Sequence, residues 1–200
     1  MRVLRIAGEE EMVATFLRAE IASPRWKDTI SDWLRRYGFD RRLVEFPDLD
    51  SASENAARAL ILGDFRGYAR NLDLFQDYPA PGTIRWEHVV LNGEDLAQVR
   101  YIDYSYWNEL SDGTRRASVA AETIRRGITV FGVSNDGFRQ AAQMLENGER
   151  FPELILVRSE GTPPVVLEGH LRLTAYFLAP ERTRADVQAF LGTSPAFAHW

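Results

Sequence analysis

Four residues that can bind or process a phosphate group lie within five consecutive positions of the chain. They are Glu168, Gly169, His170 and Arg172, in the segment VVLEGHLRLTAY. Arginine donates charge-assisted hydrogen bonds to phosphate, histidine donates to a phosphate oxygen or carries a proton near neutral pH, and glycine lets the backbone approach a ligand closely. A carboxylate repels phosphate, so we expect Glu168 to hold Mg²⁺ or to orient Arg172. The alternative interpretation is an ordinary capped turn with a local ion pair.

A second polar segment, WNELSDGTRR, follows a predicted strand and begins a predicted helix. Glu109 and Asp112 are candidates for a general base or for metal ligands. Thr114, Arg115 and Arg116 are candidates for contacts to phosphate. The alternative is that these residues cap the helix and that their charges are solvated.

The composition limits the classes of function. The net charge of −5 disfavours sequence-independent binding to DNA, which needs a basic face, so we expect no DNA partner. Cysteine is absent, which excludes disulfides, thiolate chemistry and cysteine-bound metals. The three histidines, His88, His170 and His199, are far apart in sequence, so a catalytic zinc site is not expected.

The start of the chain does not resemble a targeting signal. The segment MRVLRIAGEEEMV has no long apolar core and becomes acidic at once, and no apolar run reaches membrane-spanning length. We therefore expect a cytoplasmic protein without a membrane partner.

The elements that must position these residues differ between the two parts of the chain. Residues 1–82 are expected to form a helical extension that ends at the linker YPAPG, 78–82. Its helices are expected after the acidic turn Glu9–Glu11, over 28–37 with Gly38 as the stop, and from a Ser51 or Ser53 cap to about Gly63. This extension covers the site as a lid or forms the surface of a homodimer, and the sequence leaves both open.

Residues 83–200 alternate strands and helices. Strands are expected over 83–91 and 98–107, joined into a hairpin by the turn NGED at 92–95. Further elements are expected in the order helix 108–127, helix 134–148, strand 151–157, strand 165–169, a helix from His170 halted by Pro180, and strand 186–192. The aromatic residues of the second strand either stack on a base or pack in the core, and they are Tyr101, Tyr104, Tyr106 and Trp107.

The order helix, strand, turn, strand, acidic-Gly-His-x-Arg, helix resembles the ParB/sulfiredoxin fold family. The resemblance covers 134–185 and extends weakly back to the hairpin at 84. The residues that carry it are Pro152, Leu154, Val157, Glu168, Gly169, His170, Arg172 and Ala175. It implies an α+β fold, with a ParB/sulfiredoxin-like domain at 83–200 behind the helical extension.

The resemblance also implies a nucleotide site, because in this family the turn before the last helix meets the phosphates of a bound nucleotide. Sulfiredoxin chemistry needs a cysteine in that turn, which is missing here. Chromosome-partitioning members have adjacent arginines there and a basic surface, which this acidic chain lacks. The nearest branch is that of the free-serine kinases, whose turn reads acidic-Gly-His-His-Arg. Leu171 stands here in place of the second histidine.

The sequence therefore predicts a nucleotide-binding protein that uses ATP or another nucleotide with Mg²⁺. In its catalytic form it is a phosphotransferase or nucleotide hydrolase acting on a small molecule, with Glu168, His170 and Asp112 as catalytic residues. The residues expected to bind the cofactor are Gly169, His170, Arg172, Thr114 and Arg115, with the metal at Glu168. The alternative is a non-catalytic module that senses a nucleotide or binds a protein partner.

Overall fold

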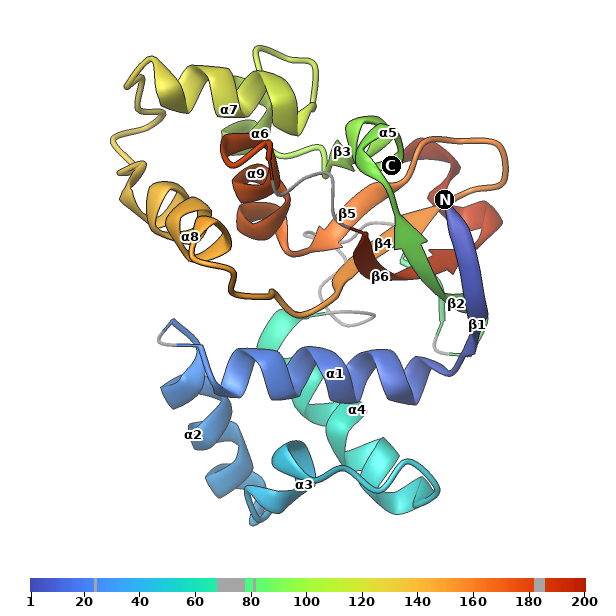
Figure 1. Ribbon diagram of the computed structural model, residues 1–200. Helices are drawn as coiled ribbons and strands as arrows, with labels where there is room; N and C mark the ends of the chain where they lie inside the picture. The colour runs from blue at the N-terminus through green and yellow to red at the C-terminus, as the bar shows by residue number, and fades with distance from the viewer. Residues whose placement is uncertain (24, 68–77, 81, 182–185) are drawn as a thin grey trace. The chain divides into compact units, whose positions relative to one another are not determined.

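The computed structural model describes residues 1–200 apart from 24, 68–77, 81 and 182–185 (Figure 1). The chain divides into two compact units. The smaller unit is Ala7–Trp86, and the larger combines Met1–Ile6 with Glu87–Trp200. The linker predicted at 78–82 lies in part outside the described residues, since it includes residue 81.

The smaller unit consists of helices whose start and stop signals are visible in the sequence. Its elements are α1 (Glu9–Ile21), α2 (Lys27–Tyr37), α3 (Arg42–Glu45) and α4 (Ala52–Arg66). Helix α2 ends at Gly38 in the left-handed conformation, with φ of 71°, as predicted. Ser51 caps α4 by accepting a hydrogen bond from the Glu54 N–H, and this helix continues past Gly63 to Arg66.

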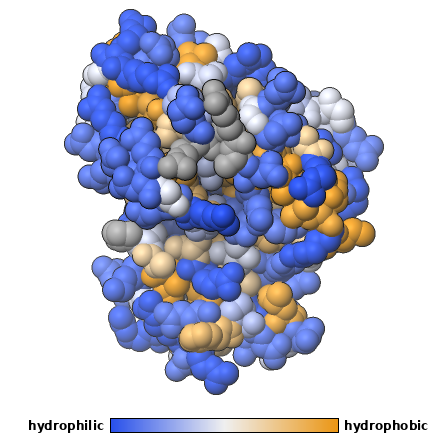
Figure 2. Space-filling model, viewed as in Figure 1, coloured by the Kyte–Doolittle hydropathy of each residue, from blue (hydrophilic) through white to orange (hydrophobic). Residues whose placement is uncertain are grey.

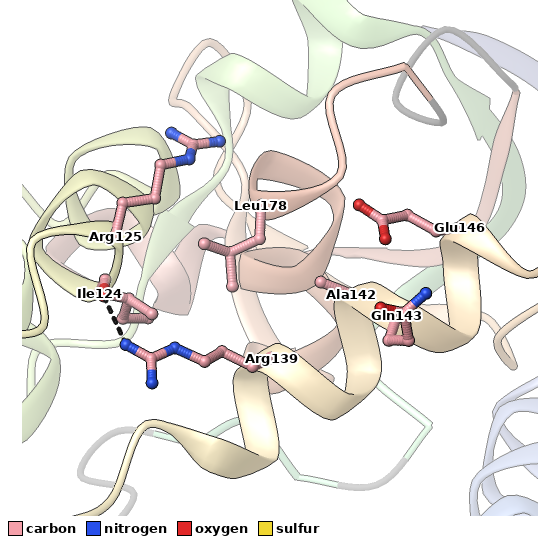
Figure 3. Close-up of a pocket in the computed structure, with 7 residues that line it drawn as sticks. All are labelled: Ile124, Arg125, Arg139, Ala142, Gln143, Glu146 and Leu178. Carbon is pink, nitrogen blue, oxygen red and sulfur yellow. Dashed lines mark hydrogen bonds between the residues drawn. The ribbon is translucent and has the colours of Figure 1, made fainter.

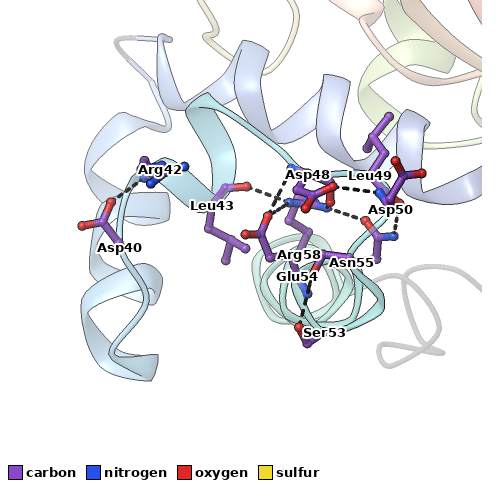
Figure 4. A network of polar contacts seen from close by, with 11 residues as sticks. Asp40, Arg42, Leu43, Asp48, Leu49, Asp50, Ser53, Glu54, Asn55 and Arg58 are labelled. Atoms are coloured by element: carbon purple, nitrogen blue, oxygen red, sulfur yellow. Dashed lines mark hydrogen bonds and ion pairs between the residues drawn. The ribbon is translucent and has the colours of Figure 1, made fainter.

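A buried arginine holds the smaller unit together (Figure 4). The Arg58 guanidinium is fully buried and donates to the carbonyls of Leu43 at 3.0 Å and Asp48 at 2.7 Å. It also donates to the Glu54 carboxylate at 3.0 Å and to the side-chain oxygen of Asn55. These bonds fix the segment between α3 and α4 against α4, so we interpret this cluster as structural.

The larger unit contains a six-stranded mixed sheet in the order β1-β2-β6-β4-β5-β3. The strands are β1 (Arg2–Ala7), β2 (Arg85–Leu91), β3 (Arg100–Tyr101), β4 (Leu154–Arg158), β5 (Val165–Glu168) and β6 (Val187–Thr193). Strand β4 is parallel to β6 and antiparallel to β5, and β5 is parallel to β3. The predicted α+β class is therefore confirmed, and so are the strands at β4, β5 and β6.

Helices of the larger unit pack beside this sheet (Figure 1). They are α5 (Gly93–Gln98), α6 (Ser105–Leu110), α7 (Ala117–Arg125), α8 (Asp136–Glu146) and α9 (His170–Leu178), and the chain ends in a short 3-10 helix, η1 (Pro195–His199). Helix α9 packs against both α7 and α8. Their apolar side chains join those of the strands in one core, in which Leu154, Val166 and Leu173 are fully buried. Helices α8 and α9 lie where the sequence predicts them.

The hairpin predicted between 83–91 and 98–107 is wrong. Strand β2 lies beside β6, whereas β3 pairs with β5 at the far edge of the sheet. The reason is local: Asn92 and Asp95 form a capping box, so the segment NGED starts helix α5 instead of a hairpin turn.

Two further expectations also differ from the structure. The single helix expected over 108–127 is divided into α6 and α7, because Asp112, Gly113 and Arg115 have positive φ angles, which a helix excludes. Strand β1 was not expected in the N-terminal region. It lies at one edge of the sheet, and its apolar side chains Val3, Leu4 and Ile6 are exposed. Figure 2 shows a hydrophobic patch at the right of the molecule.

Among the residues that the structure describes, no helix combines the length and the apolar character that crossing a membrane requires.

Candidate functional site

The Glu168–Arg172 turn and the aromatic segment that leads into WNELSDGTRR meet at one edge of the sheet. Strands β3 and β5 are parallel, with Arg100 opposite Val165 and Tyr101 opposite Val166. Both strands therefore end at the same edge, where the chain enters α6 after one and α9 after the other. We call this region, made of Tyr101–Trp107 and Glu168–Arg172, the β3–β5 edge. The carboxyl ends of parallel strands are the usual location of ligands in open α/β sheets.

Stacked rings join the two segments at the β3–β5 edge. The imidazole of His170 lies 4.8 Å from the indole of Trp107, with the ring planes 17° apart. The Tyr101 ring lies 4.7 Å from Trp107 and 6.0 Å from His170, again nearly parallel. Tyr106 and Phe138 meet Trp107 edge-on at 4.9 and 6.2 Å. Tyr101 is thus a core residue, whereas Trp107 and His170 are only partly buried.

A chain of hydrogen bonds fixes the first turn of α9 below these rings. The Thr174 hydroxyl donates to the His170 carbonyl at 2.7 Å and lies 2.7 Å from the Tyr101 hydroxyl. Because the one hydroxyl hydrogen of Thr174 is already used, Tyr101 must be the donor to Thr174. Burial raises the pKa of Tyr101 above its ordinary value, which keeps this donor protonated.

Gly169 lets other atoms come close to its backbone, and in this structure those atoms belong to side chains of the same chain. Gly169 has a φ of 100°, and a side chain there would place Cβ 2.7 Å from Leu154 Cδ2 and 3.2 Å from Arg172 Nε. Arg172 in turn donates from Nη1 to the carbonyls of Pro152 at 3.0 Å and Glu153 at 2.9 Å. These contacts tie the start of α9 to the entry of β4. Helix α9 begins without a side-chain cap or an acidic residue in its first turn, so its positive end is not neutralised by its own first turn.

The predicted metal donors do not form a metal site by themselves. Glu168 is buried at the end of β5, and Asp112 is exposed in the turn between α6 and α7. Within the described ranges, no group of three or more His, Asp or Glu side chains is arranged to hold a metal ion. The residues present therefore do not fit a Mg²⁺ ion without further ligands, and a metal at Glu168 stays a prediction.

The turn between α6 and α7 is held mainly by its own hydrogen bonds. The buried Ser111 hydroxyl donates to the Trp107 carbonyl at 2.7 Å and accepts from the Arg115 N–H at 2.9 Å. Thr114 donates its hydroxyl to the Ser111 carbonyl at 2.6 Å. Arg115 Nε donates to the Tyr101 carbonyl at 2.7 Å, which places this guanidinium beside the β3–β5 edge. Of the site residues predicted in this turn, Arg115 is thus the one that these contacts bring to the edge.

Arg100 is a candidate that the sequence reasoning missed. It lies on β3 and donates from Nη1 to the Thr114 carbonyl at 2.8 Å. The sequence placed Arg100 in one strand of a predicted hairpin, which gave no reason to expect a site there. In the structure β3 is the last strand of the sheet, and Arg100 pairs with Arg116 in an antiparallel bridge. The sequence signal for the correct arrangement is the capping box of Asn92 and Asp95, which begins α5 and is incompatible with the predicted hairpin.

Comparison of the chain with protein-family models, with curated proteins and with solved structures found no match.

Helices α7, α8 and α9 also surround a pocket of about 220 Å³ (Figure 3). Two arginines line it, and both donate to backbone carbonyls: Arg139 to Ile124 at 3.3 Å, and Arg125 to Phe177. These carbonyls belong to the last turns of α7 and α9, where positive side chains stabilise the helix dipole. The arginines of this pocket are accordingly explained as helix caps.

Proposed function

We propose that this chain binds a nucleotide at the β3–β5 edge. The observation that carries the proposal is the stacking of His170 on Trp107, which brings the aromatic segment after β3 to the first turn of α9. An aromatic surface and an uncapped helix N-terminus thereby lie side by side. The first suits a base and the second suits phosphate.

The exposed side chains suit a base at this edge. Tyr104 is 53% exposed and Trp107 is partly exposed, so part of each side chain faces solvent. Stacking of a base on an aromatic side chain contributes about 1–3 kcal/mol and tolerates any base. Arg115 adds a positive charge beside Tyr101, which favours a ligand with phosphates.

We further propose that the larger unit has the ParB/sulfiredoxin-like fold. Support comes from the order α8, β4, β5, α9 and from the acidic-Gly-His-x-Arg motif at the junction of β5 and α9. The observed β4–β5 pairing is antiparallel, with both strands almost wholly buried.

Nucleotide sensing without catalysis is favoured over phosphoryl transfer by two observations. The His170 ring is packed among aromatic rings, and the Arg172 guanidinium is bound to two backbone carbonyls. Both groups therefore already have structural contacts, and phosphoryl transfer needs groups that are positioned on the substrate. A kinase or hydrolase activity with Glu168, His170 and Asp112 is the second candidate.

The test is a thermal-shift panel of ATP, GTP, CTP and UTP, each with and without Mg²⁺. A nucleotide at about 100 times its dissociation constant adds roughly 2.7 kcal/mol of stability. We expect Trp107→Leu to lose the shift and Trp107→Phe to keep it, while Trp33→Leu in the smaller unit serves as the matched control. Absence of a shift with every nucleotide at millimolar concentration overturns the proposal. Release of phosphate from a nucleotide that binds then separates hydrolysis from sensing.

A further inference from the structure

Three arginines meet at the outer side of β3. Arg100 lies directly opposite Arg116 in an antiparallel bridge, and the Tyr101 N–H donates to the Arg115 carbonyl at 2.8 Å. Side chains directly opposite one another in such a pair lie on the same face, and like charges in that position destabilise the pairing. This arrangement therefore needs a compensating negative charge.

The chain supplies part of this charge through the carboxylate of Asp103, which raises the pKa of Arg115, but not through an ion pair. The bonds of Arg100 and Arg115 go to the backbone carbonyls of Thr114 and Tyr101, which are neutral acceptors. Within the described part of the chain, none of the three arginines takes part in an ion pair. The nearby carboxylate of Asp103 accepts a hydrogen bond from Asn108 at 2.7 Å.

One donor of this cluster is buried without an acceptor. Arg115 Nη2 is inaccessible to water and makes no hydrogen bond to any described residue. A buried charged donor without a partner is unfavourable, so an acceptor that reached this atom would stabilise it. Burial lowers the pKa of both Arg115 and Arg100. The Asp103 carboxylate partly opposes this effect at Arg115, whereas repulsion by Arg116 adds to it at Arg100.

We propose that Arg100, Arg115 and Arg116 bind a phosphoryl dianion. Each guanidinium presents a planar fork of donors that fits two oxygens of a phosphate. A dianion offsets more of the three positive charges than a carboxylate does, and its several oxygens can serve more than one fork. Arg116 is exposed and Arg100 and Arg115 are half-buried, so the cluster is accessible from solvent. The site deepens the proposed function, on which the identity of its natural ligand rests: the arginines supply contacts to the phosphates of the nucleotide in addition to those expected from the first turn of α9.

The experiment is calorimetric titration with pyrophosphate, ATP and adenosine at constant ionic strength. The test variant is Arg100→Gln with Arg116→Gln, because glutamine keeps a polar side chain while the two charges are lost. The control is Arg126→Gln, an exposed arginine that directly follows α7. We expect the double variant to bind pyrophosphate and ATP at least about tenfold more weakly. The control should bind both as the native chain does.

The remaining outcomes separate this inference from the proposed function. Binding of pyrophosphate that depends on the arginines, without binding of ATP or adenosine, leaves the arginine site standing and overturns the nucleotide proposal. Binding of ATP that is equally tight in the double variant leaves the nucleotide proposal standing and overturns the arginine site. Failure of the native chain to bind pyrophosphate also overturns the site. The melting temperature of the double variant without ligand should equal or exceed the native value, because like-charge repulsion is removed.

Discussion

The imidazole of His170 lies 4.8 Å from the indole of Trp107, with the two ring planes only 17° apart. This contact joins the start of α9 to α6 and defines the β3–β5 edge. It gives the histidine a packing role whether or not a ligand is bound there.

Replacing His170 therefore separates packing from ligand binding. An aromatic pair contributes about 0.5–1.5 kcal/mol, and His170 stacks on two rings, so we expect His170→Ala to lower the free energy of unfolding by about 1–3 kcal/mol. His170→Phe keeps the stacking and should lose much less. Urea unfolding measures both, and an equal loss in the two variants contradicts the packing role.

The sequence predicted an element correctly where a local pattern of residues is compatible with one secondary structure only. Strands β4 and β5 and helix α9 could be predicted because short apolar runs are followed by a turn, by Gly169 and finally by Pro180. The place of Gly169 and its neighbours at a strand–helix junction followed from the same pattern.

The remaining features could not be predicted for two reasons. Some short segments are compatible with two local structures, and other features depend on contacts between residues that are distant in sequence. The segment NGED suits both a hairpin turn and a helix start, and the capping box of Asn92 with Asp95 decides for the helix. Nothing local shows that Arg115 has a positive φ or that Arg172 bonds to carbonyls before β4. These features depend on tertiary packing, which overrides local preference.

The Tyr101 hydroxyl gives a prediction at high pH. Because burial raises its pKa, the folded state keeps a proton that the unfolded chain releases near its ordinary pKa of about 10. Stability from this group is fully present below that pH and is lost as the pH rises above it. Tyr101→Phe should be about 1 kcal/mol less stable at neutral pH, since the bond to Thr174 is gone.

The pH dependence of unfolding checks this assignment. The native chain should lose stability above about pH 10 more steeply than Tyr101→Phe does. The matched control is Tyr104→Phe, which changes an exposed tyrosine and should leave the difference unchanged. Identical pH profiles of Tyr101→Phe and the native chain argue against a protonated, buried Tyr101.

The buried Arg58 predicts a large loss of stability in the smaller unit. Arg58→Ala leaves the carbonyls of Leu43 and Asp48 without their donor and removes the partner of Glu54. We expect a loss of about 3–5 kcal/mol in chemical unfolding. The control is Arg35→Ala, an exposed arginine paired with Asp32, for which a change below about 1 kcal/mol is expected. A similar small effect at both positions contradicts the structural role of Arg58.

The carboxylate in this cluster extends the argument to low pH. A hydrogen bond from the Asp48 N–H, and then the bond from Arg58, lower the pKa of Glu54. Its contribution to stability is present above the ordinary glutamate pKa of about 4.3 and is lost as the pH falls through the lower folded value. In acid titrations followed by circular dichroism, Glu54→Gln should therefore show a smaller loss of stability below about pH 4 than the native chain.

Phe131 is placed where its side chain is unfavourable. It has a φ of 49° and is followed by Gly132 with a φ of 70°, and the Val133 N–H donates to the Val130 carbonyl at 2.9 Å. Two positive φ angles in such a turn are typical of type I′, which favours asparagine before glycine. The Phe131 side chain is 69% exposed, so little packing is lost when it is replaced.

Phe131→Asn should therefore stabilise the chain by about 1 kcal/mol, the cost that the left-handed conformation imposes on an ordinary side chain. Phe131→Val should destabilise it, because a β-branched residue fits positive φ worst. Thermal unfolding of the two variants beside the native chain measures both effects. If Phe131→Asn melts below the native chain, the exposed ring contributes contacts that offset its strain, and the turn is not limited by backbone conformation.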